Sequence, residues 1–432
     1  MKVLWLVSLT LPAAALACGL PATQVGGGWL TGQLRALQAA PGKPELTVGS
    51  VEAHLDRPRA GCADGVAYAV LPGGSMADFT AFLRADPPDL VHIWGTEYAA
   101  AQAMQQAATA LGIPTLVGVQ GVMRDCAAHL CDGVPGRYLT SCWAQRLIDR
   151  AVPGALLDQS QARFDALAQS EAAVLAGAAH VTGRTGFDRR AVAELAPHAR
   201  YWPCNETLRP AFYGGVRWQK HDFSTAPTLL LPQGNYPLKN LHTALRALPT
   251  VLQRWPEATL CVAGWPPLDK GPLLRPVIDW MFPYQRYCKA LAAQLGVSEH
   301  LRYTGPLQAE AMRQAYLDAD VFLLPSFSEN SPNSLGEAML LGAPCVASKV
   351  GGIPDLLDSG VEGLLYHPAG DADALATALC AVLSAPDHGA ALGAAAHARA
   401  ARTHDPVANA ATLVGIYRGI LHEHGHGEVP PQ

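Results

Sequence analysis

The sequence is poor in charged residues and lacks the features of several large protein classes. Only 16% of its 432 residues are Asp, Glu, Lys or Arg, and the net charge is −5. Nucleic-acid-binding chains usually carry a basic excess, so we expect no nucleic-acid partner. Half of the residues are hydrophobic, which excludes a disordered chain and predicts well-packed cores. At this length two domains are expected.

The sequence also lacks the cysteine spacing of a metal site or a disulfide framework. The ten cysteines form no C-x-x-C pair, and the nearest two are Cys126 and Cys131. Cysteines scattered in this way are typical of buried free thiols. Three histidines cluster, His422, His424 and His426, in a polar tail that favours a flexible end over a metal site. We expect no metal and no bound cofactor.

Long apolar runs are missing beyond residue 20, where none reaches the roughly 18 residues that span a bilayer. Residues 1–19, MKVLWLVSLTLPAAALACG, resemble a secretory or lipoprotein leader, and equally a first buried strand. Pro12 interrupts the run, and Leu16 stands where a lipobox has a small residue. We therefore reject a signal peptide, assign residues 2–8 to a strand and expect a cytoplasmic protein.

Short apolar strands alternate with Ala-rich helical stretches along the chain. This alternation predicts an α/β fold of two doubly wound, Rossmann-like domains with a ligand cleft between them. We expect strands at 2–8, 45–51, 65–71, 89–94, 115–120, 178–182, 228–232, 259–263, 321–325 and 345–348. We expect helices at 76–85, 97–111, 160–177, 240–254, 284–295, 308–318, 371–384 and 405–422.

The alternation falters between residues 204 and 225 and then restarts with a strand, which predicts a linker. We expect an N-terminal domain at 1–212 and a C-terminal domain at 213–402. A last helix at 403–423 is expected to return to the N-terminal domain, followed by a flexible tail at 424–432.

The most informative stretch is PSFSENSPNSLGEAMLLGAPCVASKVGGIPDLLDSGVEGLLY, residues 325–366. A helix is expected from about Ser334 to Leu341, ended by Gly342. The N–H groups at its start would bind a phosphate.

Two carboxylates flank this predicted phosphate site, Glu329 in the loop and Glu337 in the first helical turn. Carboxylates accept hydrogen bonds from sugar hydroxyls on either side of a diphosphate. Residues 334–337 also fit a capping box, in which Glu337 is structural, and Glu329 also fits an ordinary loop acid. The residues alone leave both interpretations open.

The E-x7-E spacing of Glu329 and Glu337 resembles glycosyltransferase family 4. The G-x-P-x-V and G-G-x-P-[ED] segments of that family match residues 342–346 and 351–355. The stretches DLVHIWGTEY, TGRTGFDRR, CNETLRPAFY and GNYPLKNLH look like those of one bacterial subgroup of the family. The resemblance covers nearly the whole chain.

The resemblance implies the GT-B fold and metal-independent, retaining transfer of a hexose-type sugar. The donor would be a nucleotide diphosphate sugar, a co-substrate rather than a cofactor, with UDP favoured by its frequency in the family. The acceptor would be a glycan, a lipid-linked sugar or another small molecule, as in polysaccharide biosynthesis. Glu329 would lie beside the donor sugar, Glu337 would hold the ribose, and amides around Asn333, Ser334 and Leu335 would bind the diphosphate.

Members of the family usually have an Arg and a Lys five residues apart after the first strand of the second domain. Here Lys239 is present, but Gly234 stands at the Arg position. Lys239, with Asn235 nearby, is the main candidate to stabilise the leaving diphosphate, and a solvated lysine is the alternative. Arg184 is a candidate for the second positive charge, reaching across the cleft.

In the first domain, Gly26, Gly27 and Gly28 permit close backbone approach to a ligand, and similar glycines of the family face the donor phosphate. Where the family tends to have a His after strand 115–120, this chain has Gln120. His92 also fits a core histidine. The candidates for the acceptor side are His92, Trp94, Glu97 and Gln120.

Residues 137–151, RYLTSCWAQRLIDRA, contain three arginines and one aspartate, with Leu139, Cys142, Trp143 and Leu147 on one helical face. Such a helix fits peripheral contact with an anionic membrane, and a helix packed on its own domain is the other interpretation.

Two other functions share parts of this pattern. A nucleotide-sugar epimerase has the same architecture and differs in needing no acceptor. A periplasmic sugar-binding protein also has two α/β domains, but it does not predict a phosphate-binding helix start flanked by glutamates. The triplets 318–320 and 371–373, both D-A-D, lie at expected helix ends, which favours structural roles over metal binding.

Overall fold

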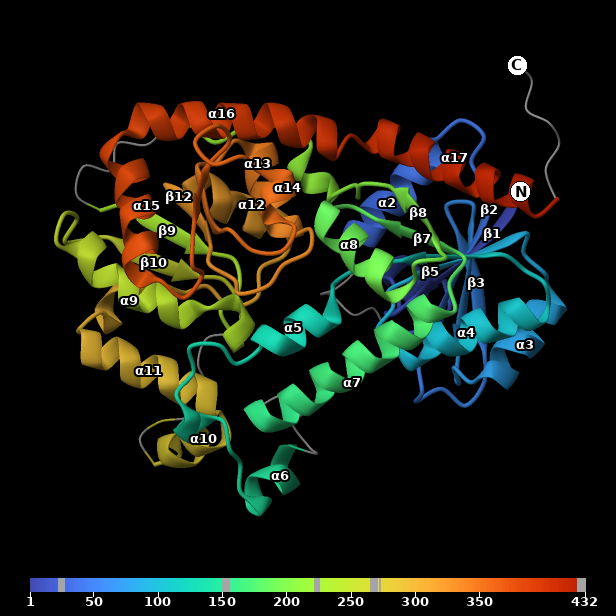
Figure 1. Ribbon diagram of the computed structural model, residues 1–432, viewed down its shortest axis with the longest axis horizontal. Coiled ribbons are helices and arrows are strands. Elements are labelled where there is room, and N and C mark those ends of the chain that lie inside the picture. Colours follow the sequence, from blue (N-terminus) through green and yellow to red (C-terminus); the bar gives the residue numbers. More distant parts are fainter. Residues whose placement is uncertain (22–27, 150–155, 221–225, 265–270, 272, 426–432) are drawn as a thin grey trace. The chain divides into compact units, whose positions relative to one another are not determined.

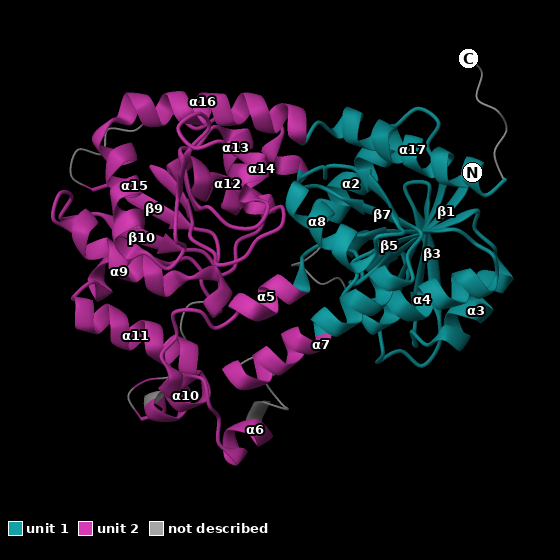
Figure 2. Ribbon diagram, in the orientation of Figure 1, with its two compact units in different colours: residues 1–123, 167–209, 404–432 teal, residues 124–166, 210–403 magenta. Residues whose placement is uncertain are grey.

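The computed structural model describes residues 1–21, 28–149, 156–220, 226–264, 271 and 273–425. The chain divides into two compact units (Figure 2). Unit 1 contains residues 1–123, 167–209 and 404–432, and unit 2 contains residues 124–166 and 210–403. The sequence placed residues 124–166 in one unbroken domain at 1–212. The structure groups them with unit 2, and the last helix with unit 1.

Unit 1 is built on an eight-stranded sheet of order β3-β4-β2-β1-β5-β6-β7-β8. Only β3, which pairs with β4, is antiparallel. The strands are β1 (Lys2–Val7), β2 (Glu45–Val51), β3 (Arg59–Ala63), β4 (Val66–Leu71), β5 (Leu90–Trp94), β6 (Thr115–Gly118), β7 (His180–Gly183) and β8 (Arg200–Pro203). The first strand lies between β2 and β5, so residues 2–7 form a buried central strand as predicted.

Helices cover both faces of this sheet (Figure 1). They are α1 (Pro12–Ala17), α2 (Gly28–Ala39), α3 (Met76–Ala85), α4 (Ala99–Ala110), α8 (Gly186–Leu195) and α17 (Pro406–Glu423). Alternate residues of β1 enter two cores. Val3 and Trp5 pack with α2 and α17, whereas Leu4 packs with α3 and α4. The indole of Trp5 donates to the hydroxyl of Tyr417 over 2.8 Å, which ties α17 to the central strand.

Unit 2 is built on a six-stranded parallel sheet of order β11-β10-β9-β12-β13-β14. The strands are β9 (Thr228–Leu231), β10 (Thr259–Val262), β11 (Leu301–Tyr303), β12 (Val321–Leu324), β13 (Cys345–Ser348) and β14 (Leu364–Tyr366). The strand order reverses between β9 and β12, and ligands of doubly wound domains bind beyond the carboxyl ends of strands at such a point.

The helices of unit 2 are α6 (Trp143–Asp149), α9 (Leu241–Leu252), α10 (Arg275–Met281), α11 (Pro283–Leu295), α12 (Ala309–Asp318), α13 (Asn333–Leu341), α14 (Ile353–Leu356), α15 (Ala372–Ser384) and α16 (Pro386–Thr403). Two helices, α5 (Met123–His129) and α7 (Leu157–Ala176), include residues of both units. The single-turn 3₁₀ helices are η1 (Gly136–Tyr138), η2 (Pro210–Phe212), η3 (Pro237–Lys239) and η4 (Ser298–His300).

All ten cysteines carry free thiols. Five of them are buried, but Cys62 and Cys142 are exposed. The expectation of buried thiols is therefore wrong for Cys62 and Cys142. Among the described residues, no single helix is long and apolar enough to cross a bilayer. The helix α15 and residues 386–423 meet those criteria only as a bent pair.

Candidate functional site

Two loops of unit 2 follow neighbouring strands at the reversal of strand order. Residues 232–240 follow β9, and residues 325–332 follow β12, which pairs directly with β9. These loops carry the two residues predicted to be catalytic, Lys239 and Glu329. The fold therefore brings together residues that lie 90 positions apart in the sequence.

Lys239 and Glu329 form an ion pair with 2.5 Å between Nζ and Oε1. Their side chains are 15% and 11% exposed. Burial alone would lower the pKa of Lys239, but the charge of Glu329 outweighs it and raises the pKa above its ordinary value. Ser326 also donates to Oε1 of Glu329 over 2.7 Å. The ammonium is therefore charged and held beside a fixed carboxylate, which contradicts the alternative of a solvated lysine.

Asn240 fixes the loop that carries Lys239. This residue is fully buried and has a left-handed backbone, with φ of +58°. Its side-chain amide donates to the carbonyls of Pro325 and Ala369, each over 2.9 Å. The backbone N–H of Phe327 also donates to the carbonyl of Leu238 over 2.9 Å. Because these bonds join the two loops, Lys239 and Glu329 are held by their backbones as well as by their charges.

The G-G-x-P segment supports Glu329 from another side. The N–H of Gly352 donates to the carbonyl of Glu329 over 2.9 Å. Gly351 has φ of +52°, and a Cβ at this position would lie 1.9 Å from the same carbonyl oxygen. Only glycine fits there. The two motifs that the sequence presents separately are therefore one packed unit.

The helix α13 begins at Asn333, and its N-cap is Pro332, which provides no side-chain cap. The capping-box interpretation of residues 334–337 is therefore wrong. The carbonyl of Pro332 accepts from the N–H groups of Leu335 and Gly336. The amide of Leu335 is therefore not available to a diphosphate, which corrects that part of the prediction. Among the described residues, the N–H groups of Asn333 and Ser334 have no hydrogen-bond partner. They are donors available to an anion at a helix N-terminus.

Glu337 is 3% exposed and lies one turn into α13. A carboxylate this deep in the unit is not an ordinary surface acid. The expected contact of Glu337 with a nucleotide ribose stays a prediction.

Gly234 fills a site with no room for a side chain. A Cβ at this position would lie 2.8 Å from Cγ1 of Val262 and 3.3 Å from Cδ2 of Leu241. An arginine therefore cannot replace Gly234 without a change in packing. The neighbouring residue Asn235 is exposed, and its side chain lies 3.1 Å from where a Cβ of Gly264 would be.

In unit 1, the first two candidates for the acceptor side are core residues. His92 is fully buried, hydrogen-bonded through Nδ1 to the hydroxyl of Tyr417 over 2.7 Å, and stacked on Trp94. Burial lowers the pKa of His92 to about 3, so the imidazole is neutral. Trp94 is also buried and packs edge-on against Trp5 and Trp29. These contacts correct the expectation that His92 and Trp94 face an acceptor.

Glu97 and Gln120 have structural contacts as well. Glu97 is buried, which raises its pKa, and its carboxylate accepts from the N–H of Thr96 over 2.8 Å. The carbonyl of Gln120 accepts from Arg184 over 2.7 Å. Both contacts involve residues of unit 1 alone, and an acceptor role for either side chain stays a prediction.

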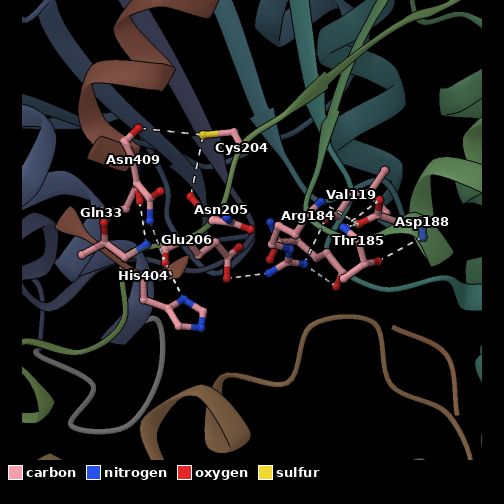
Figure 3. A network of polar contacts seen from close by, with 12 residues as sticks. Gln33, Val119, Arg184, Thr185, Asp188, Cys204, Asn205, Glu206, His404 and Asn409 are labelled. Carbon is pink, nitrogen blue, oxygen red and sulfur yellow. Dashed lines mark hydrogen bonds and ion pairs between the residues drawn. The ribbon is translucent and has the colours of Figure 1, made fainter. Parts of the chain in front are cut away.

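Arg184 lies in a polar network of unit 1 (Figure 3). Its Nη1 is 2.5 Å from Oε2 of Glu206, and the two side chains are 5% and 4% exposed. Its Nη2 donates to the carbonyls of Val119 and Gln120. A guanidinium with these partners is already neutralised. This corrects the expectation that Arg184 provides the second positive charge for a donor.

The glycine turn is described only in part. Gly26 and Gly27 lie outside the described residues, and Gly28 is the first residue of α2. A Cβ at Gly28 would lie 2.7 Å from Cδ of Arg209. The arginine therefore packs against the start of α2. No sequence pattern indicated this contact, because Arg209 lies in the expected linker.

Residues 137–151 begin with η1 and continue into α6, and residues 150 and 151 lie outside the description. Trp143 and Leu147 are 77% and 52% exposed and lie one turn apart on α6. Three further exposed apolar residues, Leu273, Leu274 and Val277, lie at and before α10. The side chain of Gln145 donates to the carbonyl of Trp280 over 2.6 Å, which joins α6 to α10. The sequence pattern at residues 137–151 did not indicate that exposed apolar residues also lie at α10.

Comparison with known proteins matches the part of the chain that contains this site to a protein family. Residues 227–385 match the family model "Glycosyl transferases group 1". A D-inositol 3-phosphate glycosyltransferase of Corynebacterium efficiens is 33% identical over 148 residues, which are 33% of this chain and 32% of that protein. A GDP-mannose-dependent phosphatidylinositol monomannoside mannosyltransferase of Mycolicibacterium smegmatis is 28% identical over 184 residues, 41% of this chain and 44% of that protein. The matches thus span less than half the length of these relatives.

Solved structures match nearly the whole chain. Sucrose-phosphate synthase from Thermosynechococcus elongatus has a TM-score of 0.69 at 17% identity, covering 98% of this chain and all of that one. The Anabaena protein HepE, solved with UDP and glucose, has a TM-score of 0.62 at 17% identity, covering 96% and 99%. The expected α/β architecture and the resemblance to glycosyltransferases are confirmed. The chain has the GT-B fold, and its residues 227–385 match the model of the group 1 glycosyltransferases.

Proposed function

We propose that the protein is a retaining, metal-independent glycosyltransferase of family 4. It transfers a hexose-type sugar from a UDP-sugar to a glycan or lipid-linked acceptor. The observation that carries the proposal is the buried ion pair of Lys239 and Glu329, held by three loops within the matched domain. Ser334, in the first turn of α13 and five residues after Glu329, has an N–H with no hydrogen-bond partner among the described residues.

Each residue of this site has a distinct role. Lys239 and the amides of Asn333 and Ser334 bind the diphosphate, Glu329 lies beside the donor sugar, and Glu337 binds the ribose. Gly234 and Asn235, on the same loop as Lys239, lie beside the bound donor. The bond between the anomeric carbon and the phosphate oxygen breaks as the acceptor oxygen attacks from the same side. The departing phosphate oxygen takes the proton of the acceptor, and Lys239 stabilises the charge that develops there.

The known proteins leave the base of the donor open. One relative is GDP-mannose-dependent by name, and one structural neighbour was solved with UDP. Thermal-shift measurements with UDP, GDP and ADP distinguish these donors, because a ligand that binds only the folded state raises Tm. We expect UDP to give the largest increase. If no nucleotide at millimolar concentration raises Tm, the proposed function is wrong.

A nucleotide-sugar epimerase is the closest alternative enzyme. Incubation with UDP-hexoses, with and without carbohydrate acceptors, separates the two activities. Transfer requires an acceptor, whereas an epimerase changes the sugar nucleotide without one. The other class, a periplasmic sugar-binding protein, would show neither reaction. On the proposal the donor is a cytoplasmic metabolite, so we expect the protein in the cytoplasm.

We further propose that α6 and α10 contact an anionic membrane and bring the protein to a lipid-linked acceptor. The exposed residues Trp143 and Leu147 on α6 and Val277 on α10 support this, because aromatic and apolar side chains beside arginines favour a lipid interface. Co-sedimentation with vesicles of phosphatidylglycerol and phosphatidylcholine tests it. We expect binding only to the anionic vesicles, and loss of binding in Trp143→Ser/Leu147→Ser. The matched control is Val361→Ser, which changes an exposed apolar residue elsewhere in unit 2.

A further inference from the structure

A short helix that the function has not used lies against the loop of Glu329. The carboxylate of Asp125, on α5, accepts a hydrogen bond from the hydroxyl of Ser328, which directly precedes Glu329. Sγ of the neighbouring Cys126 lies 3.8 Å from the same hydroxyl. Burial raises the pKa of Cys126 to about 12, and Glu329 and Lys239 lie close enough to affect it. The start of α5 is therefore packed beside the ion pair.

The segment that follows α5 is also fixed on unit 2. A Cβ at Gly133, where φ is +70°, would lie 2.6 Å from Nε2 of His242 on α9. The carbonyl of Gly133 accepts from the hydroxyl of Tyr287 over 3.2 Å and from Arg246 over 3.4 Å. Contacts on both sides thus hold residues 125–133 in place, and Asp125 is a fixed group rather than a loose surface acid.

The hydroxyl of Ser328 has few other contacts. Ser328 is 2% exposed, and among the described residues its side chain bonds only to Asp125 and Cys126. Its neighbours are held by their backbones, Phe327 by Leu238 and Glu329 by Gly352. Between those two bonds, the contact with Asp125 is the side-chain anchor of the loop. A hydroxyl that donates to a carboxylate forms one of the stronger hydrogen bonds in proteins.

We propose that Asp125 is a positioning residue that acts through Ser328 to hold Glu329 in its orientation. In the structure, the carboxylate of Glu329 is also held by the charge of Lys239. A donor diphosphate that binds Lys239 weakens that attraction, and the bond between Asp125 and Ser328 then keeps the loop in place. The inference rests on the proposed function, because it assigns Asp125 to the same reaction.

Three single variants and one double variant test the inference by kinetics. Asp125→Ala and Ser328→Ala each remove the bond, and we expect about a tenfold or larger drop in kcat with a smaller change in KM for the donor. Asp125→Ala also removes the contact of this carboxylate with Nε2 of His129, 3.9 Å away. The double variant should therefore be no worse than Asp125→Ala, which already lacks the bond to Ser328. Asp125→Asn keeps an acceptor oxygen for Ser328 and should retain most of the activity.

The matched control is Ser141→Ala. Ser141 donates to Asp158 over 2.6 Å, which is the same type of contact in the same unit but away from the site. We expect its kcat to be unchanged. Two results overturn the inference, because each means that Asp125 acts independently of Ser328. One is that Asp125→Asn lowers kcat as much as Asp125→Ala. The other is that the fold-loss of kcat in the double variant equals the product of the fold-losses in the two single variants.

Amide hydrogen exchange tests the inference without activity. We expect faster exchange at Phe327 and Gly352 in Asp125→Ala and Ser328→Ala but not in Ser141→Ala. The N–H groups of these two residues join the loop of Glu329 to its neighbours, since Phe327 donates to the carbonyl of Leu238 and Gly352 to the carbonyl of Glu329. Unchanged exchange in the first two variants overturns the inference. If Asp125→Ala does not fold, Ser328→Ala, which removes a single oxygen, carries both measurements. A wild-type protein that turns over no nucleotide sugar refutes the proposed function, while the exchange result still tests the link between Asp125 and Ser328.

Discussion

The two units use buried charge in different ways. Both are doubly wound sheets, and the chain order reverses between β1 and β5 in unit 1 and between β9 and β12 in unit 2. In unit 2, the ion pair of Lys239 and Glu329 lies on loops at this reversal and keeps 15% and 11% exposure. In unit 1, Arg184 and Glu206 are less exposed, and Arg184 also bonds to two carbonyls. On the proposed function, the first pair exchanges partners with a ligand, whereas the second is part of the core of unit 1.

The largest effect is expected at Glu329. Glu329→Ala should lower the rate of sugar transfer roughly a thousandfold, because it removes a preorganised group beside the reacting sugar, while unit 2 stays folded. Activity assays measure the rate of sugar transfer, and circular dichroism checks that the variant is folded. Glu362→Ala is the matched control, since Glu362 is a buried glutamate of unit 2 that pairs with Arg399. It should change stability rather than kcat. If Glu329→Ala has wild-type activity, the pair of Lys239 and Glu329 has no part in the reaction. The contrast with the pair of Arg184 and Glu206 would then no longer hold.

The next effect concerns stability. Arg184→Met removes the ion pair with the buried carboxylate of Glu206, and we expect the free energy of unfolding of unit 1 to fall by about 3 kcal/mol or more. Urea denaturation measures this loss. The control is Arg200→Met, which breaks a more exposed pair with Glu423 and should cost about 1 kcal/mol at most. If Arg184→Met keeps the wild-type free energy of unfolding but binds UDP more weakly, Arg184 belongs to the donor site. The contrast between the two ion pairs would then be wrong.

A smaller effect is expected for nucleotide binding. Lys239→Met should weaken UDP binding about tenfold or more, because a charge-assisted bond to the diphosphate is lost. Titration calorimetry gives the Kd. Lys220→Met is a suitable control, since Lys220 forms an exposed pair with Asp387 in the same unit. Unchanged affinity for UDP would exclude Lys239 from the donor site.

The smallest effect is a pH dependence of stability. Burial lowers the pKa of His404 in unit 1 to about 4. Below the ordinary pKa of about 6.5, the unfolded chain binds a proton there that the folded chain does not bind. Stability is therefore lost as the pH falls from about 6.5 towards 4, by about 1.4 kcal/mol per pH unit for this group. Urea denaturation at pH 6.5 and 5.5 should show a smaller loss in His404→Gln than in the wild-type protein. Equal losses in both proteins would contradict the assignment.

The central strands could be predicted because strands buried on both faces appear as continuous apolar runs. The predicted strands at 45–51 and 345–348 match β2 and β13 in full. The strands β3, β8, β11 and β14 were missed, since each is at least partly exposed and none has a long apolar run. The helices that were missed are α1, α2, α5, α8, α10, α14 and α16. The Ala-rich sequence of α16 lacks a clear apolar face.

The candidate site shows the same limit. Glu329, Glu337 and the glycine segment could be identified because their spacing is local. The contact between Asp125 and Ser328 joins residues 203 positions apart, and no local pattern indicates it. The assignment of Arg184 to the donor was wrong for a similar reason, since its partner Glu206 belongs to another segment of the chain.

The tight packing around Gly234 restricts how the site can be altered by mutation. The missing arginine cannot be restored by one substitution, because its Cβ would overlap the side chain of Val262. Val262 would have to become smaller first, and that change alone leaves a cavity in the core and gains nothing for the reaction. The two substitutions are therefore useful only together. A library of single variants would discard both, whereas a combined Val262→Ala/Gly234→Arg library would reveal whether a second cation improves the enzyme.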